Sequence, residues 1–104
     1  MPPIATLTAD GVRVITLRGS VSEVDAAHLR TMLVQAIWHE RPAGVLVEVR
    51  ADVLMDSTAI GALVAAADIA GDQRVRLDIR CDDPVLRARL QALGARVVAN
   101  SDQP

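Results

Sequence analysis

The stretch Leu54-Met55-Asp56-Ser57-Thr58-Ala59-Ile60-Gly61 places an acid and two hydroxyl groups between an apolar strand and a nearly uncharged helix. Hydroxyl groups at the start of a helix lie close to backbone N–H groups that have no partner within the helix. The same N–H groups and the helix dipole would hold a phosphate there. We therefore interpret the stretch as a candidate switch site centred on Ser57, with a structural N-cap as the alternative role for that serine.

The segments on either side of this stretch are predicted from their composition. Val45-Leu46-Val47-Glu48-Val49 is too apolar for a half-exposed strand, so we expect it inside a sheet with both faces largely covered. A loop over residues 50–55 should follow. The next helix is expected to run from about Ser57 to Ala70 and to stop at Gly71, a frequent C′ residue.

The predicted helix from Ser57 to Ala70 has almost no polar outer face. Asp68 is the only charged residue between Ala59 and Ala70, so part of the helix should be hidden. The residues expected to face the sheet are Ile60, Leu63, Val64 and Ala67. Those left to a neighbour or to solvent are Gly61, Ala62, Ala65, Ala66 and Ile69. Because glycine and alanine allow another backbone to approach closely, this side is a candidate docking surface or simply the outside of a core helix.

The N-terminal part of the chain predicts a hairpin and a capped helix. Residues 4–8 and 12–18 are β-branched runs around Ala9-Asp10-Gly11, and they should pair antiparallel. Ser22-Glu23-Val24-Asp25 has the form of a capping box and starts a helix. One apolar stripe of that helix follows helical spacing: Leu29, Met32, Leu33, Ala36 and Ile37. Arg41-Pro42 and Gly44 should end it.

The C-terminal part predicts a strand, a helix and a second strand. Val75, Leu77 and Ile79 alternate with charged residues, as in a strand with one buried face. Asp83 is the expected cap of a third helix, with Pro84 as its first residue and an end near Gly94. A short strand over residues 95–99 should close the chain.

The order of these elements predicts an α/β fold. Strand, strand and then three helix–strand units give a mixed, mainly parallel sheet with right-handed crossovers. A chain of 104 residues with 51% hydrophobic residues suits one domain over residues 1–104. Its core should span about 4–98, with a short tail over 99–104.

Composition argues against several classes of partner and location. The net charge of -2, the single Trp and the absence of Tyr and Phe give no basis for nucleic-acid binding. Cys81 is the only cysteine, which excludes an internal disulfide and suits a reducing cytoplasm. No apolar run reaches the length of a membrane span, and the N-terminus lacks the regions of a signal peptide. A cytoplasmic location without membrane contact is expected.

Enzyme and metal signatures are weak. The sequence contains no glycine-rich phosphate loop, and His28 and His39 have no neighbouring ligand residues. A hydrolase using Ser57 as nucleophile would need an orienting acid and an oxyanion hole, which no motif indicates. We therefore predict a protein that is not an enzyme and that binds no metal and no cofactor, with a minor hydrolase as a remote alternative.

The sequence resembles the bacterial anti-sigma factor antagonists, whose fold is the STAS domain. The resemblance rests on Met55-Asp56-Ser57-Thr58, on Gly61, on the strand from Gly44 to Val49 and on the hairpin through Val12 to Gly19. It spans residues 4–98 and implies a sheet of about five strands, opened by a β-hairpin and covered by about three helices.

The resemblance also implies a function. Ser57, with Thr58 as second choice, corresponds to the residue that a partner phosphorylates, and this partner is both anti-sigma factor and serine kinase and itself binds ATP and Mg. Unmodified protein would bind that partner and free the sigma factor for transcription, and phosphorylated protein would let go. The residues expected to contact the partner are Ser22, Asp25, Asp56, Ser57, Thr58, Gly61, Ala62 and Ala65.

Some positions depart from the family pattern. The family usually has Asp in place of Ser22, Ser or Thr in place of Asp25, and Gly in place of Ala59, whose methyl group could narrow the access of a kinase loop. These departures leave an alternative open. The chain would then be a STAS scaffold, or a sensor of a ligand or of redox state through Cys81, that works independently of Ser57.

Overall fold

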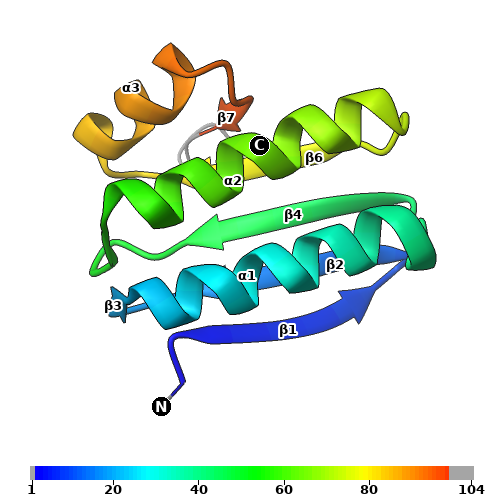
Figure 1. Ribbon diagram of the computed structural model, residues 1–104, viewed down its shortest axis with the longest axis horizontal. Coiled ribbons are helices and arrows are strands. Elements are labelled where there is room, and N and C mark those ends of the chain that lie inside the picture. Colours follow the sequence, from blue (N-terminus) through cyan, green and yellow to red (C-terminus); the bar gives the residue numbers. More distant parts are fainter. Residues whose placement is uncertain (1, 99–104) are drawn as a thin grey trace.

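A computed structural model describes residues 2–98 of the chain (Figure 1). The elements follow in the order β1 (Ile4–Ala9), β2 (Val12–Leu17), β3 (Ser20–Val21), α1 (Glu23–Gln35), a π-helical turn η1 (Ala36–Glu40), β4 (Gly44–Val49), β5 (Leu54–Met55), α2 (Ser57–Asp72), β6 (Leu77–Cys81), α3 (Pro84–Ala92) and β7 (Val97–Val98). Ala99 and the predicted tail lie outside the described residues. No helix among those described is long and apolar enough to cross a membrane.

The main sheet has five strands in the order β1-β2-β4-β6-β7. β1 and β2 pair antiparallel, and every other neighbouring pair is parallel, which confirms the mixed, mainly parallel sheet opened by a hairpin. Asp10 and Gly11 form the two-residue turn, with φ of 53° and 80°. Positive φ at both positions is what a type I′ hairpin turn requires.

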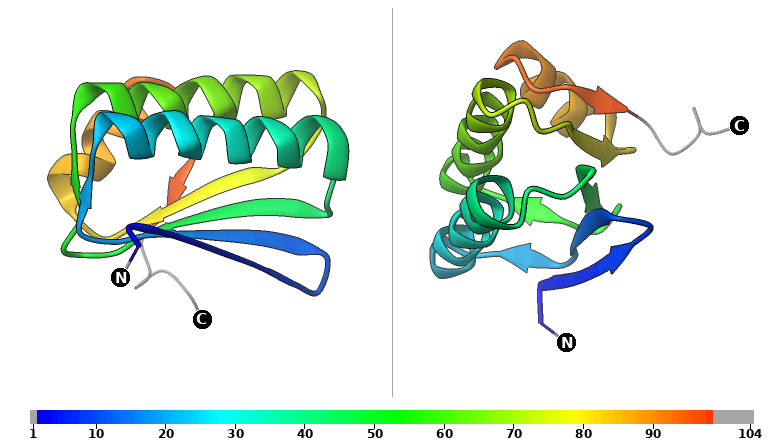
Figure 2. Two further views of the ribbon diagram at one scale, coloured as in Figure 1. Left: turned by 60° about the horizontal axis from the view of Figure 1, so that its bottom comes forward. Right: turned by 90° about the vertical axis from the view of Figure 1, so that its right-hand side faces the viewer.

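Helices α1 and α2 lie side by side over one face of the sheet, and α3 lies next to β7 (Figures 1 and 2). The core forms between this face and the helices. Fully buried residues come from β2, β4 and β6, from α1 and η1, and from α2 and α3. The largest of them are Ile15, Leu17, Leu29, Leu33, Ile37, Ile60, Leu63, Ile79, Leu90, Val47 and Cys81.

Strand β4 lies in the middle of the sheet as predicted, but only one of its faces is fully covered. Val45, Val47 and Val49 are buried beneath the helices, whereas Leu46 and Glu48 are half-buried on the opposite face. Glu48 there forms an ion pair with Arg80 of β6, with 3.6 Å between Oε1 and Nη1. The expectation of two covered faces is therefore wrong, because α1 and α2 both lie over the same face of the sheet and leave the other face partly exposed.

The predicted stripe of the first helix is confirmed. Four of its members are buried and Met32 is partly buried against the core. The helical segment continues as η1, where the N–H of Arg41 donates to the carbonyl oxygen of Ala36 at 2.8 Å. Arg41 then takes a left-handed conformation, with φ of 45°, and the chain turns toward β4. The end near Arg41-Pro42 was predicted, and the π-helical turn before it was not.

Helix α2 ends later than predicted, and Gly71 is not its C′ residue. The helix reaches Asp72, and Arg74 takes the left-handed position, with φ of 58°. The N–H of Val75 donates to the carbonyl oxygen of Ala70 at 2.9 Å, and the N–H of Arg74 to that of Gly71 at 3.2 Å, which is the Schellman pattern. Because this ending returns the buried Val75 to the core, packing outweighs the glycine preference.

The predicted faces of α2 also need correction. Ile60 and Leu63 are buried as expected, but Val64 and Ala67 are only half-buried. Ala62 and Ala66, which were expected to lie outside the core, are buried. The reason is that α1 packs along α2, so that α2 is covered from the sheet and from one side. Part of the small-residue side of α2 thus serves the fold itself.

A second, two-stranded sheet was not predicted. Leu54 and Met55, expected as the end of a loop, form β5 and pair in parallel with Ser20 and Val21 of β3. Two further predictions near the C-terminus are confirmed. Asp83 caps α3 by accepting from two backbone N–H groups, and Pro84 is the first helical residue.

Candidate functional site

All three helices begin at the same edge of the main sheet (Figure 1). Strands β2, β4 and β6 run parallel, and the chain leaves the carboxyl end of each strand toward a helix. The caps are Ser22 for α1, Asp56 for α2 and Asp83 for α3. The pairing of β3 with β5 joins the chain segments that lead into α1 and α2. The predicted residues of two separate loops are therefore brought to one edge.

Asp56, not Ser57, is the N-cap of α2. One carboxylate oxygen of Asp56, Oδ1, accepts a hydrogen bond from the backbone N–H of Ala59 at 3.0 Å. Ser57 is the first residue of the helix and is exposed, and no residue in the described part of the chain hydrogen-bonds to its side chain. The alternative that Ser57 serves as the structural cap is therefore wrong. Its hydroxyl group is left to solvent or to a partner.

We expect the Asp56→Ala substitution to lower the free energy of unfolding by about 1 kcal/mol, because the N–H of Ala59 loses its acceptor. Asp56→Asn should retain most of this stability, since the amide oxygen can accept the same bond. Urea denaturation of the three proteins checks the prediction. Equal losses for alanine and asparagine would show that the negative charge, rather than the capping hydrogen bond, stabilises the helix.

Ser22 and Asp25 form a complete capping box at the start of α1. The carboxylate of Asp25 accepts from the backbone N–H of Ser22 at 3.0 Å and from the Ser22 hydroxyl group at 2.8 Å. The N–H of Asp25 in turn donates to the oxygen of Ser22 at 3.2 Å. These hydrogen bonds, that from the Ser22 backbone first, lower the pKa of Asp25 below its ordinary value of 3.8. Both side chains hold the helix start, so contact with a partner remains a prediction for them.

The lowered pKa of Asp25 predicts a pH dependence of stability. A carboxyl group whose pKa is lower in the folded state contributes stability above its unfolded pKa and loses it as the pH falls through the folded value. As the pH falls below about 3.8, we therefore expect the free energy of unfolding to decrease less for Asp25→Asn than for the wild type, because asparagine does not titrate. Unfolding free energies measured over this acid range test it. Parallel curves for the two proteins would contradict it.

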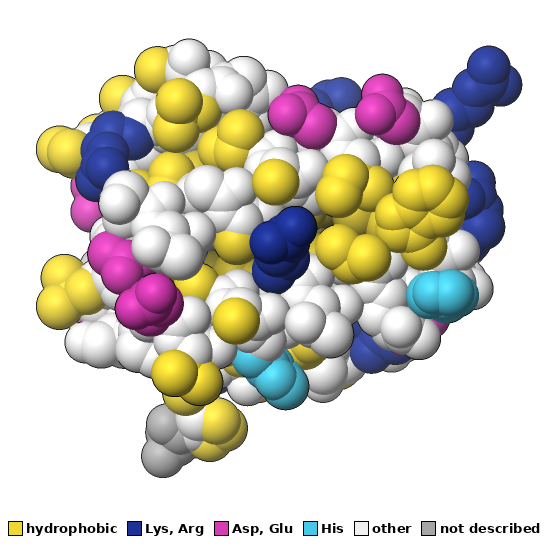
Figure 3. Space-filling model, viewed as in Figure 1, with side chains coloured by type: hydrophobic (Ala, Val, Ile, Leu, Met, Phe, Trp, Pro, Cys, Tyr) yellow, Lys and Arg dark blue, Asp and Glu magenta, His cyan; other side chains and the backbone are white. Residues whose placement is uncertain are grey.

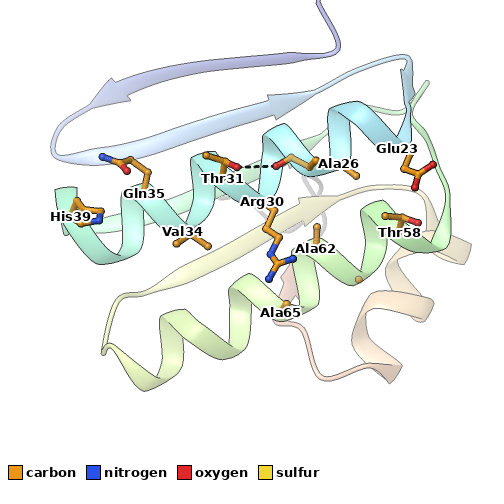
Figure 4. A pocket seen from close by; sticks show the side chains of 12 residues that line it. Glu23, Ala26, Arg30, Thr31, Val34, Gln35, His39, Thr58, Ala62 and Ala65 are labelled. Carbon is orange, nitrogen blue, oxygen red and sulfur yellow. Dashed lines mark hydrogen bonds between the residues drawn. The ribbon is translucent and has the colours of Figure 1, made fainter.

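A groove of about 870 Å³ runs between α1 and α2, and Thr58, the residue after Ser57, forms part of its lining (Figure 4). Thr58, Gly61, Ala62 and Ala65 line it from α2, so four of the predicted partner residues share this surface. From α1, Arg30 extends across the middle of the groove toward Ala62 and Ala65. Figure 3 shows a basic side chain in this position, among apolar and uncharged groups.

The predicted partner residues that line the groove differ in their exposure to solvent. Gly61 and Ala65 are exposed, and a methyl group added at Gly61 would meet no atom within 4 Å. Ala62 is buried, so it offers little surface to a partner. Ala59 is fully buried, which means that its methyl group faces the core and cannot narrow the access of a kinase loop. The obstruction of a kinase loop that the sequence suggested at Ala59 is therefore absent.

Three exposed apolar side chains border the helix starts and were not predicted. Val24 is 79% exposed, Leu54 70% and Val85 70%. Val24 and Val85 are each the second residue of their helix, and Leu54 precedes the cap of α2 by two residues. Apolar residues at the second position of a capped helix are the sequence signal that could have revealed two of them. Exposed apolar groups gathered at one edge are typical of a protein-binding surface.

The remaining chemical candidates lie elsewhere. Burial raises the pKa of the Cys81 thiol above its ordinary value, which disfavours the thiolate needed for redox sensing. Within residues 2–98, no group of His, Cys, Asp and Glu side chains is arranged to hold a metal ion. Neither Cys81 nor a metal site therefore offers an alternative to the helix starts as the candidate site among the residues described.

Comparison with known proteins identifies the family. The model of the STAS domain matches residues 3–99. The phosphorylated form of Bacillus SpoIIAA, described as a cell fate determinant, is 16% identical with a TM-score of 0.77, over 95% of this chain and 92% of that chain. RsbS of Moorella thermoacetica is 13% identical with a TM-score of 0.77, over 95% and 88%.

A third similar structure is an anti-sigma factor antagonist from Mycobacterium paratuberculosis, 18% identical with a TM-score of 0.70, over 88% of this chain and 76% of that chain. Comparison with curated proteins finds no match. At these identities the solved structures show a shared fold, and the family model covers nearly the whole sequence. The chain therefore belongs to the STAS domain family.

Proposed function

We propose that this STAS domain is an anti-sigma factor antagonist, a binding protein without enzymatic activity that phosphorylation of Ser57 switches off. Its partner is an anti-sigma factor with serine kinase activity, which itself binds ATP and Mg. The observation that supports the proposal best is the exposed Ser57 hydroxyl group, which has no hydrogen-bond partner in the described part of the chain because Asp56 caps the helix. The similar SpoIIAA has been solved in unphosphorylated and phosphorylated forms.

The fold should tolerate a phosphate at this position. Phosphorylation adds a charge of about -1.5 to -2 at pH 7. The first backbone N–H groups of α2 and the helix dipole offset part of this charge, by about 0.3 to 1 kcal/mol at an exposed site. Ser57 is exposed, so the phosphate needs no rearrangement of the core. The added charge therefore acts mainly on whatever protein covers the site.

The surface around Ser57 suits a protein partner. Val24, Leu54 and Val85 offer exposed apolar contacts at the edge of the sheet where α2 begins with Ser57, and the bare Cα of Gly61 allows close approach along the groove. Apolar contacts at the centre of an interface exclude water. A charge introduced there meets a lower effective dielectric than in water, which strengthens its repulsion of nearby carboxylates.

The test is capture of a partner on the immobilised chain, followed by addition of Mg-ATP. We expect release of the captured protein together with incorporation of one phosphate at Ser57, measured by intact and peptide mass spectrometry. Ser57→Ala should capture the same protein and retain it after ATP is added. Thr58→Ala removes the second-choice hydroxyl group and should still take up one phosphate at Ser57 and then release the captured protein. Release of the partner from Ser57→Ala would contradict the proposal.

A second candidate function has its own observation. Arg30 lies in the middle of the groove and forms no ion pair with the residues described. The groove thus offers a positive charge among small apolar and uncharged polar side chains, with the carboxylate of Glu23 also in its lining. A STAS module that senses an anionic small molecule would use this arrangement independently of Ser57. Loss of ligand-induced stabilisation in Arg30→Gln, with no effect of Ser57→Ala, would favour it over the switch.

A further inference from the structure

Strand β1 forms an exposed edge of the main sheet (Figure 2). Its sequence, Ile-Ala-Thr-Leu-Thr-Ala, contains no charge and no proline, and five of its six residues are exposed. Natural proteins usually protect a sheet edge with charges, proline, bulges or a very short strand. At the opposite edge, β7 is two residues long. β1 is thus a long edge that lacks these protective features.

The hydrogen bonds of the hairpin show which backbone groups of β1 are unused by β2. In a hairpin with a two-residue turn, the residues that flank the turn, Ala9 and Val12, form a hydrogen-bonded pair, and such pairs alternate along the strands. The N–H of Arg18 donates to the carbonyl oxygen of Pro3 at 2.9 Å, which continues the same alternation. The residues whose N–H and C=O groups point away from β2 are Ile4, Thr6 and Thr8.

We propose that β1 pairs antiparallel with β1 of a second copy of this chain, about a two-fold axis at Thr6. In this register Thr6 lies opposite Thr6, and Ile4 lies opposite Thr8. All three sets of outward backbone groups then find partners. A slide of one residue would place outward groups opposite groups that β2 already uses, and a slide of two residues would leave one set without a partner strand residue. The strand carries no charge, so the two copies do not repel each other there.

Side chains also fit this register. Leu7 is 56% exposed and would lie beside Ala5 of the second copy, on the face of the sheet away from α1 and α2. Three steps of about 4.8 Å separate the two copies of β2, which gives about 14 Å between them. Two packed helices need about 8 to 10 Å, so the two copies of α1 have room on the same face.

The dimer would leave the candidate switch accessible. An axis perpendicular to the sheet reverses the strand direction in the second copy, so the two edges that carry Ser57 point in opposite directions. Ser57 lies on α2, and β1 lies at the edge of the sheet next to β2. Pairing through β1 therefore does not depend on the proposed function of Ser57, and either can hold without the other.

Disulfide cross-linking tests the register. Opposite residues in a hydrogen-bonded antiparallel pair have Cα atoms about 5.5 Å apart, within the span of a disulfide. Thr6→Cys should therefore give a covalent dimer under mild oxidation. Thr8→Cys is the matched control, since its counterpart in the second copy lies about four residues further along. The native Cys81 is buried and should not contribute. Equal cross-linking of both variants would overturn the proposed register.

Sedimentation equilibrium tests the association itself. The wild type should shift with concentration from the 11.1 kDa monomer toward twice that mass. Thr6→Pro removes an N–H that β2 does not use and should weaken dimerisation about tenfold or more. Circular dichroism checks that the variant is folded. If it does not fold, the comparison of Thr6→Cys with Thr8→Cys still tests the dimer. A wild type that stays monomeric at all accessible concentrations would overturn the proposal.

Discussion

Replacing Ser57 by aspartate is expected to weaken the complex with the proposed partner, an anti-sigma factor, by between about fivefold and about a thousandfold. A unit charge about 4 Å from a carboxylate of the partner costs about 1 kcal/mol in water and about 4 kcal/mol near a surface of lower effective dielectric. Each 1.4 kcal/mol corresponds to about a tenfold change in affinity. The exposed position of Ser57 at the start of α2 means that the substitution should leave the fold unchanged.

Isothermal titration with the purified partner measures this effect. Ser57→Asn is the matched control, because asparagine has the size of aspartate without its charge, and it should bind much more tightly than Ser57→Asp. Raising the salt concentration should reduce the difference between the two variants, since exposed charges are screened. An aspartate variant that binds as tightly as the wild type would show that charge at this position is not the switch.

Replacing Leu63 by alanine is expected to lower the free energy of unfolding by about 2 to 5 kcal/mol. Leu63 is fully buried on α2, and its removal leaves a cavity that the surrounding core fills only in part. Domains of this kind have a total stability of about 5 to 15 kcal/mol, so the loss is a large share of it. Urea denaturation monitored by circular dichroism provides the measurement.

Leu54→Ala provides the control for the same chemical change at an exposed site. Leu54 is 70% exposed, so its truncation should change the stability by no more than about 0.5 kcal/mol. If Leu54 contacts the anti-sigma factor as proposed, this variant should lose affinity while keeping its stability. Similar destabilisation by both substitutions would mean that burial does not determine the stability of this domain as we describe it.

The parts of the fold that could be predicted from the sequence are those that depend on contacts within a few residues. The Asp10-Gly11 turn, the capping box of Ser22 and Asp25, and the Asp83 cap followed by Pro84 are all local. Each of these devices satisfies backbone groups close in sequence, so the pattern of residue types is sufficient to predict them.

The errors arise where tertiary packing decides. The end of α2 lies beyond Gly71 because Val75 must return to the core, and no local signal encodes that requirement. Ala62 and Ala66 are buried because α1 lies beside α2. A helical pattern shows which residues share a side, but it does not tell whether that side meets another helix, a partner or water.

The candidate site, too, could be predicted from the sequence only in part. The acid and the hydroxyl groups at the start of α2 are visible in the sequence, but either Asp56 or Ser57 can serve as N-cap, and only the structure shows that Asp56 does. Val24, Leu54 and Val85 escaped prediction because about 30 residues separate each from the next. The parallel order of β2, β4 and β6 brings their loops to one edge.

This shared edge has an evolutionary consequence. The exposed side chains at the helix starts lie at the rim, whereas the largest buried side chains of the core lie beneath the bodies of α1 and α2. Mutations at positions such as Leu54 and Val85 can therefore accumulate without endangering folding. Duplicated copies of such a domain can therefore diverge toward different partners within one cell. Each copy keeps the same core, while changes at its rim prevent it from binding the partners of the other copies.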